Sequence, residues 1–199
     1  GGPDHAALWA GTADSWVDLH PAGAFESVAR GGDGGQQTGY AFFGSLPRAG
    51  LWTGTAESWV DLTPAAADYS WAYGVYGGRQ VGAAWIDGER HAGLWSGSAA
   101  SWVDLHEFLS PGFIDSLAYG TWHDGVSTYG VGVGYNTTTL REEALMWIGP
   151  AQCAGDATDI NCDCILNASD VDPFVLALID PAAFAATLPG CSIEHADLN

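Results

Sequence analysis

The chain has 199 residues and 47% hydrophobic content, which is enough for a buried core and excludes a disordered tail. It carries 24 acidic residues against five arginines and no lysine, for a formal net charge of −19. Nucleic acids and anionic membranes are poor partners for such a chain because both require a basic surface, whereas cations, calcium above all, are attracted to it. The 28 glycines and 10 tryptophans favour turn-rich β structure over helices.

An internal repeat occupies residues 5–149. Its copies are HAALWAGTADSWVDLHP at 5–21, RAGLWTGTAESWVDLTP at 48–64, HAGLWSGSAASWVDLHE at 91–107 and the weaker EALMWIG at 143–149. The tryptophan of the Leu-Trp pair recurs every 43 residues over the first three copies. Two further short pieces recur between the copies, the first beginning at Ser27, Ser70 and Ser116.

Each period contains four short apolar runs separated by Gly, Asp, Pro and Ser turns, and four strands in about 43 residues are typical of a propeller blade. We therefore expect residues 1–150 to form a mainly β domain, a β-propeller-like array of four-stranded repeats. The copies supply two, four, four and three strands, whereas four complete blades would need sixteen, at about four per blade. Either the N-terminal strands close a ring against the last copy, or open edges are left for another subunit or for missing chain.

Several repeated residues are expected to have structural roles. Glycines within strands are expected to let neighbouring sheets approach closely, and we place Gly39, Gly82 and Gly130 there. Trp9 and its equivalents should fill the space between blades. A group present once per repeat usually does the same structural job in each, so the aspartates of Trp-Val-Asp-Leu should form turns or side-chain-to-backbone hydrogen bonds. These aspartates are Asp18, Asp61 and Asp104.

Histidines also follow the repeat, but not in every copy. They occur at His5, His20, His91 and His106, and the second copy has Arg48 and Thr63 instead. This variability argues against a metal ring of histidines. Serine-nucleophile elbows, phosphate loops and zinc motifs are absent from the sequence, so we expect no enzyme activity.

The repeat pattern ALW.G, WVDL, S.A.G and GGQQ.GY resembles the extracellular HAF-type repeats of exported bacterial proteins over residues 5–149. The resemblance implies a propeller-like fold and an extracellular or cell-surface location. That family has no assigned reaction, so the resemblance provides no catalytic residues.

A second module is expected at 151–199, a segment that contains eight acidic residues and no lysine or arginine. Within it, oxygen side chains fall at positions one, three, five, nine and twelve of a 12-residue loop, with a backbone carbonyl at position seven, which is the spacing of a calcium loop. The expected ligands are Asp159, Asn161, Asp163, the carbonyl of Ile165, Asn167 and Asp170.

This loop resembles the half EF-hands of dockerins, in which Asp closes the loop and a single helix follows, here at 171–179. The expected turn glycine is replaced by Cys164, and Asp170 is a shorter closing ligand than Glu. A second loop begins at Asp197 and Asn199. Either the sequence is cut there, or these two residues complete a metal site elsewhere, for example on a neighbouring molecule.

Four cysteines, all after residue 150, favour two disulfides in an exported protein, with zinc binding as the alternative. Three connectivities are open to them. We expect Cys162 to pair with Cys191 and Cys153 with Cys164, and an exchange of partners is the alternative.

Together these patterns predict a non-enzymatic extracellular structural or assembly protein. Its repeat domain and calcium module would bind another protein or further copies of the chain, head to tail in filaments. The alternative is a carbohydrate-binding or carbohydrate-processing propeller anchored through the dockerin-like module, because exposed Trp and Tyr side chains stack well on sugars.

Overall fold

The computed structural model describes residues 2–150 and Ala183. The chain divides into two compact units, and the first, Gly1–Trp122 with Tyr129–Ile148, contains nearly all of the described residues. These residues form mainly β structure in four antiparallel sheets, which confirms the predicted class. The strands of this part of the chain do not close into a barrel or a propeller. No helix among the described residues is long and apolar enough to span a membrane.

Thirteen strands are distributed over the four sheets of the described region as two, four, four and three, which confirms the distribution expected from the repeats. The first sheet contains β1 (Ala7–Leu8) and β2 (Val17–Asp18). The second contains β3 (Glu26–Asp33), β4 (Gln36–Phe43), β5 (Leu46–Trp52) and β6 (Val60–Asp61). The third contains β7 (Tyr69–Tyr76), β8 (Arg79–Ile86), β9 (Glu89–Trp95) and β10 (Val103–Asp104). The fourth contains β11 (Phe113–His123), β12 (Ser127–Asn136) and β13 (Arg141–Pro150).

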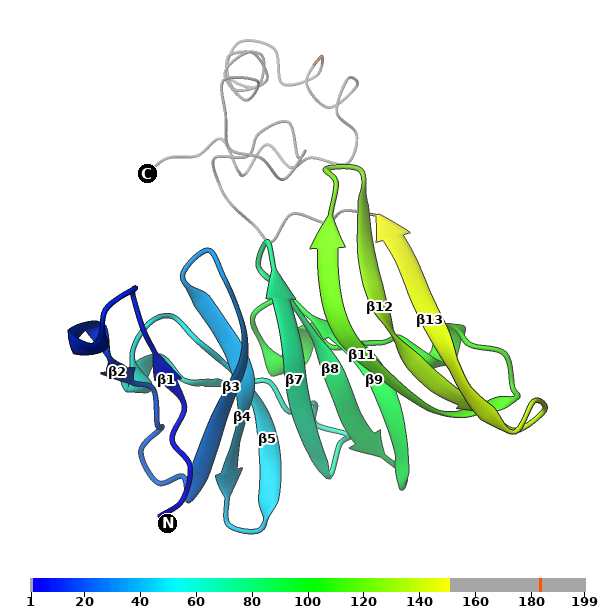
Figure 1. Cartoon of the computed structure of the whole chain (residues 1–199). Helices are drawn as coiled ribbons and strands as arrows, with labels where there is room; N and C mark the ends of the chain where they lie inside the picture. The colour runs from blue at the N-terminus through cyan, green and yellow to red at the C-terminus, as the bar shows by residue number, and fades with distance from the viewer. Residues whose placement is uncertain (1, 151–182, 184–199) are drawn as a thin grey trace. The chain divides into compact units, whose positions relative to one another are not determined.

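Neighbouring strands are also neighbours in sequence, so each sheet is a simple meander (Figure 1). Two-residue glycine turns make the first hairpins possible. Gly34 and Gly35, between β3 and β4, have φ angles of 53° and 87°, as a type I′ turn requires. Gly77 and Gly78 repeat this turn between β7 and β8.

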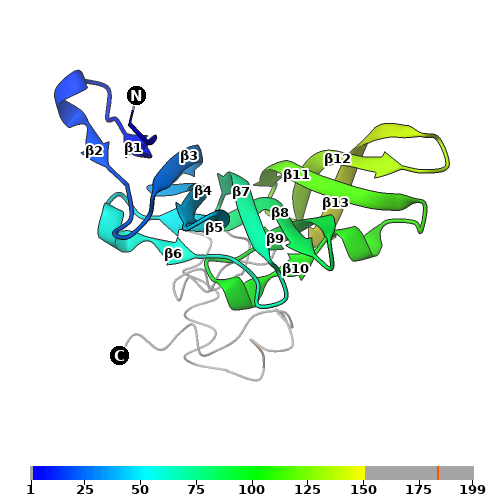
Figure 2. The ribbon, with the colours of Figure 1, turned by 90° about the horizontal axis from the view of Figure 1, so that it is seen from below.

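Short 3-10 helices precede the last strand of each of the first three repeats, β2, β6 and β10 (Figure 2). They are η1 (Ala13–Ser15), η2 (Ala56–Ser58) and η3 (Ala99–Ser101), and a further one, η4 (His106–Phe108), follows β10. In η2, the Ser58 hydroxyl donates to the Thr55 carbonyl at 2.6 Å and accepts from the Thr53 backbone amide at 2.8 Å. This turn places Trp59 against Gly50, where a Cβ would lie less than 3.0 Å from the indole ring.

Close approach between sheets depends on other glycines than we expected. A Cβ on Gly39 or Gly82 would lie less than 3.0 Å from a carbonyl of the adjacent strand in the same sheet, because each faces a β-bulge there. Gly130 has no such contact, since its nearest atom would be 3.7 Å away. Neighbouring sheets instead meet at Gly31 and Gly74, whose Cβ atoms would lie 3.0 and 2.7 Å from carbonyl oxygens of the next sheet.

The apolar core is divided into clusters, each shared by two consecutive sheets. Trp52 and Trp95 are fully buried in two of these clusters, which confirms the packing role expected for them. Trp9, at the equivalent position of the first repeat, is 57% exposed, so the expectation was wrong for that residue. Trp52 and Trp95 each pack with residues of the preceding sheet, and no described sheet precedes the one that contains β1, so Trp9 has no such surface to pack against.

Candidate functional site

A polar network recurs beside the strand pairs β1–β2, β5–β6 and β9–β10, which are the last two strands of the first three repeats. The antiparallel register pairs Gly93 of β9 with Asp104 of β10, and the Leu105 amide then donates to the Ala92 carbonyl at 2.8 Å. The next pair in this register places His91 opposite His106, and the same register places His5 opposite His20 and Arg48 opposite Thr63. Cross-strand neighbours on one face of a sheet are close enough to interact.

The repeated aspartates organise the chain in this network. One carboxylate oxygen of each accepts from the backbone amide two residues later, at 2.8 Å in all three repeats. This confirms the structural role expected for Asp18, Asp61 and Asp104. The second oxygen binds His5 Nδ1 at 3.1 Å, Arg48 at 2.6 Å and His91 Nδ1 at 2.6 Å, respectively.

The pKa of the Asp18 carboxyl is lowered in this setting. Partial burial of the group acts in the opposite direction, but the hydrogen bond from the His20 amide and the contact with His5 outweigh it.

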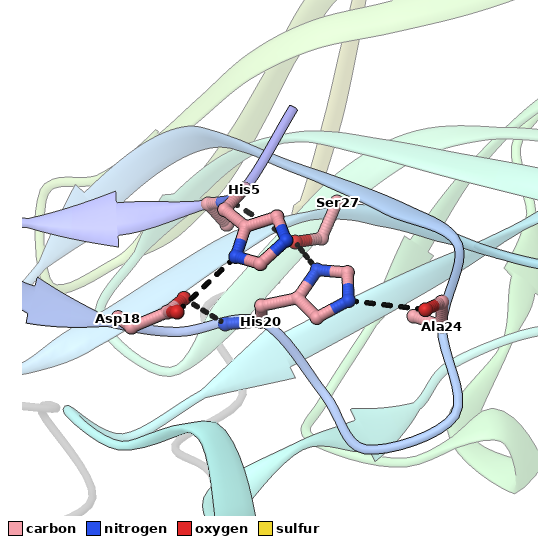
Figure 3. A network of polar contacts seen from close by, with 6 residues as sticks. His5, Asp18, His20, Ala24 and Ser27 are labelled. Carbon is pink, nitrogen blue, oxygen red and sulfur yellow. Dashed lines mark hydrogen bonds and ion pairs between the residues drawn. The ribbon is translucent and has the colours of Figure 1, made fainter. Parts of the chain in front are cut away.

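A buried serine of the following sheet completes each network. The Ser27 hydroxyl accepts from the Ala6 amide at 3.0 Å and lies 2.8 Å from His20 Nδ1, as Figure 3 shows. Ser70 and Ser116 make the equivalent contacts in the next two repeats, and all three serines are fully buried. The network therefore ties each sheet to the one that follows.

The networks of the first and third repeats both contain two stacked histidines but differ around them. In the first, His20 Nε2 is bound to the Ala24 carbonyl at 3.0 Å (Figure 3). In the third, His106 is the first residue of η4, and no partner of its Nε2 is found in the described part of the chain. Burial, and then the neighbouring His91, lower the pKa of His106 and favour its neutral form.

Glu89 joins the third network and gives it the groups of a metal site. One nitrogen of His91, one nitrogen of His106 and a carboxylate oxygen of Glu89 all lie within 4.8 Å of one another. Two imidazoles and a carboxylate are ligands that zinc accepts. The repeat pattern brings His91 and His106 forward only as members of a histidine ring, which its variability argues against, and it does not identify Glu89. The sequence does contain a sign of Glu89, because it lies two residues before His91 in the same strand, and residues two apart in a strand share a face.

A separate pocket of about 540 Å³ lies mainly on the second repeat, with Pro21 and Ala22 of the preceding segment also in its lining. Phe43 and Trp59 form its aromatic part, with ring centroids 5.9 Å apart. Its polar lining consists of Glu57 and the ion pair between Arg48 and Asp61.

The residues that we expected to bind calcium lie outside the described part of the chain, as do all four cysteines. The calcium ligands concerned are Asp159, Asn161, Asp163, Ile165, Asn167 and Asp170, with Asp197 and Asn199 of the second loop. Both expectations remain predictions. Comparison of the chain with protein-family models, with curated proteins and with solved structures found no match.

Proposed function

We propose that the chain is a non-enzymatic, exported structural protein that associates with further copies of itself, head to tail, through the open edges of its sheets. This proposal rests on the unequal numbers of strands in the sheets. The β1–β2 sheet has no counterparts of β3 and β4, and the β11–β13 sheet has no counterpart of β6 or β10 among the described residues. An unpaired strand edge offers backbone donors and acceptors to another chain.

The two open edges differ, so a contact between them is heterologous. Each copy would add its β1 edge to the β13 edge of the next, and such a contact continues into a filament unless rotation closes it into a ring. The propeller-like arrangement expected from the repeats is retained in this proposal, with the array continued across copies.

Exposed apolar side chains support β13 as the binding edge. Met146 and Ile148 of β13 are 59% and 60% exposed. Leu145 stands at the position of Gly50 and Gly93, which receive the tryptophan that precedes the fourth strand in the second and third repeats. A strand resembling β6 therefore cannot cover this edge in the same way, which leaves it to a different partner strand.

The same proposal includes a calcium ion bound by the loop at 159–170. The spacing of oxygen ligands in this loop and its resemblance to dockerin loops support it. A bound calcium ion would order this module and neutralise part of the net charge of −19, which otherwise makes copies repel one another. Association should therefore depend on calcium.

Sedimentation velocity on the full chain tests the proposal. We expect large species with calcium and smaller ones after addition of a chelator. Met146→Lys with Ile148→Lys should reduce association in calcium, because charges on an edge strand oppose pairing. Leu46→Lys, at the exposed start of β5, is the matched control and should associate normally. A monomer in calcium, or equal association of the two variants, would overturn the proposal.

The pocket of the second repeat supports carbohydrate binding as a second candidate function. Trp59 and Phe43 provide aromatic surface, and Glu57 and Arg48 provide polar groups beside it. Hydrolysis of a glycoside would need two carboxylates across one bond, but Asp61 is already held by Arg48 and the Thr63 amide. Binding without hydrolysis is therefore the version favoured by the geometry. A glycan array should show ligands that Glu57→Gln weakens, and an array without ligands would remove this candidate.

A further inference from the structure

We propose that Glu89, His91 and His106 bind a zinc ion in the third repeat. Glu89 and His91 are two residues apart on β9 and share one face of the strand, and His106 lies opposite His91. One potential ligand atom from each residue lies within 4.8 Å of the other two. A tetrahedral zinc with bonds of about 2.0–2.1 Å holds its ligands roughly 3.4 Å apart, so side-chain rotations are enough to close the site.

The unused nitrogen of each histidine is the one that would bind the metal. His91 Nδ1 lies 2.6 Å from Asp104, and His106 Nδ1 lies 2.8 Å from Ser116. Each Nδ1 thus has its own partner, and no Nε2 contact of either histidine is found in the described region. Because Asp104 can only accept, it fixes the His91 proton on Nδ1 and leaves Nε2 as a free electron pair. Metal-binding histidines are typically oriented in this way, by a carboxylate or another acceptor on the second nitrogen.

Ser116 can support the same arrangement at His106. Its hydroxyl oxygen already accepts from the Ala92 amide at 2.9 Å and has a second lone pair for His106 Nδ1–H.

Comparison of the repeats separates the metal ligands from the structural network. The second repeat forms the same network with Arg48 and Thr63, so neither histidine is needed to hold the sheets together. The first repeat has both histidines, but Pro3 stands at the position of Glu89, and His20 Nε2 is bound to the Ala24 carbonyl. Among the described repeats, only the third combines two free imidazole nitrogens with a carboxylate.

The ligand set indicates the kind of metal. Two imidazoles and one carboxylate suit zinc, whereas calcium prefers oxygen ligands alone. Three protein ligands leave a fourth position for water. The site is therefore distinct from the calcium loop expected at 159–170, both in its residues and in its metal.

Titration with Co²⁺, which reports its coordination in the visible spectrum, tests the proposal. The full chain is used with its cysteine thiols oxidised or alkylated, so that sulfur ligands do not contribute. We expect one equivalent of tetrahedral Co²⁺ that zinc displaces and excess calcium does not. Glu89→Gln should weaken binding at least about tenfold.

Two double substitutions provide a matched pair of variants. His91→Arg with His106→Thr introduces the residues that the second repeat uses, so the fold should persist while binding is lost. His5→Arg with His20→Thr makes the same exchange in the first repeat and should leave binding unchanged. Circular dichroism checks that both variants are folded. No tetrahedral Co²⁺ in the wild-type protein, or binding that survives the third-repeat exchange, would overturn the proposal.

Discussion

Gly93 provides a sharp test of how the fourth strand is attached to its sheet. A Cβ at this position would lie less than 3.0 Å from ring carbons of Trp102, so Gly93→Ala forces the indole or the strand to move. Overpacking of this kind costs about 1–3 kcal/mol. Trp102 also packs on the buried Trp95, with ring centroids 4.7 Å apart, and loss of such an aromatic contact costs about 0.5–1.5 kcal/mol more. We therefore expect Gly93→Ala to lower the free energy of unfolding by about 2–4 kcal/mol.

Urea unfolding followed by tryptophan fluorescence measures this cost, and a double-mutant cycle assigns its cause. In a Trp102→Leu background the ring carbons are absent, so the cost of Gly93→Ala should fall below about 1 kcal/mol. Gly130→Ala is the control, because the nearest atom to its Cβ would be 3.7 Å away and ordinary packing results. An equal cost of Gly93→Ala in both backgrounds would refute the reasoning.

Two further predictions concern buried polar groups. Ser70→Ala removes the acceptor of the Ala49 amide, so chemical denaturation should show that the free energy of unfolding falls by about 1–3 kcal/mol. Ser45→Ala, at an exposed serine, is the control, and a cost of Ser70→Ala no larger than that of Ser45→Ala would contradict this. Burial raises the pKa of the Tyr73 hydroxyl above its usual value of 10.0, so the folded state keeps this proton longer than the unfolded state does. Stability should therefore fall as the pH rises above 10.0, and Tyr73→Phe should reduce that fall in thermal melts at alkaline pH. Identical alkaline profiles of the two proteins would count against this assignment.

Local patterns were sufficient to predict the β class, the repeat and the number of strands in each sheet. Glycine pairs such as Gly34-Gly35 specify tight hairpins, and the regular spacing of the Leu-Trp pair marks the same strand in each copy. The role of Asp61 and its equivalents was also predictable, because it depends on a residue only two positions away.

Features that depend on pairing between distant residues could not be predicted in this way. The glycines at the contact between sheets were not identified because a bulge between Ala29 and Gly31 interrupts the register of β3 with β4, and that register depends on both strands together. The cluster of Glu89, His91 and His106 requires the register of β9 with β10. Whether the sheets close into a ring depends on how successive sheets pack, and the repeat length does not determine it.

The serine contacts also have a mechanical consequence. Ser27, Ser70 and Ser116 each hold the backbone of the preceding repeat, and the apolar clusters are likewise shared by consecutive sheets. Force applied along such an array is transmitted from sheet to sheet, through nearly identical contacts between consecutive sheets. The weakest link is the β1–β2 sheet, whose two strands have only two residues each. Under tension this sheet should yield first, and the larger sheets should then unravel one after another.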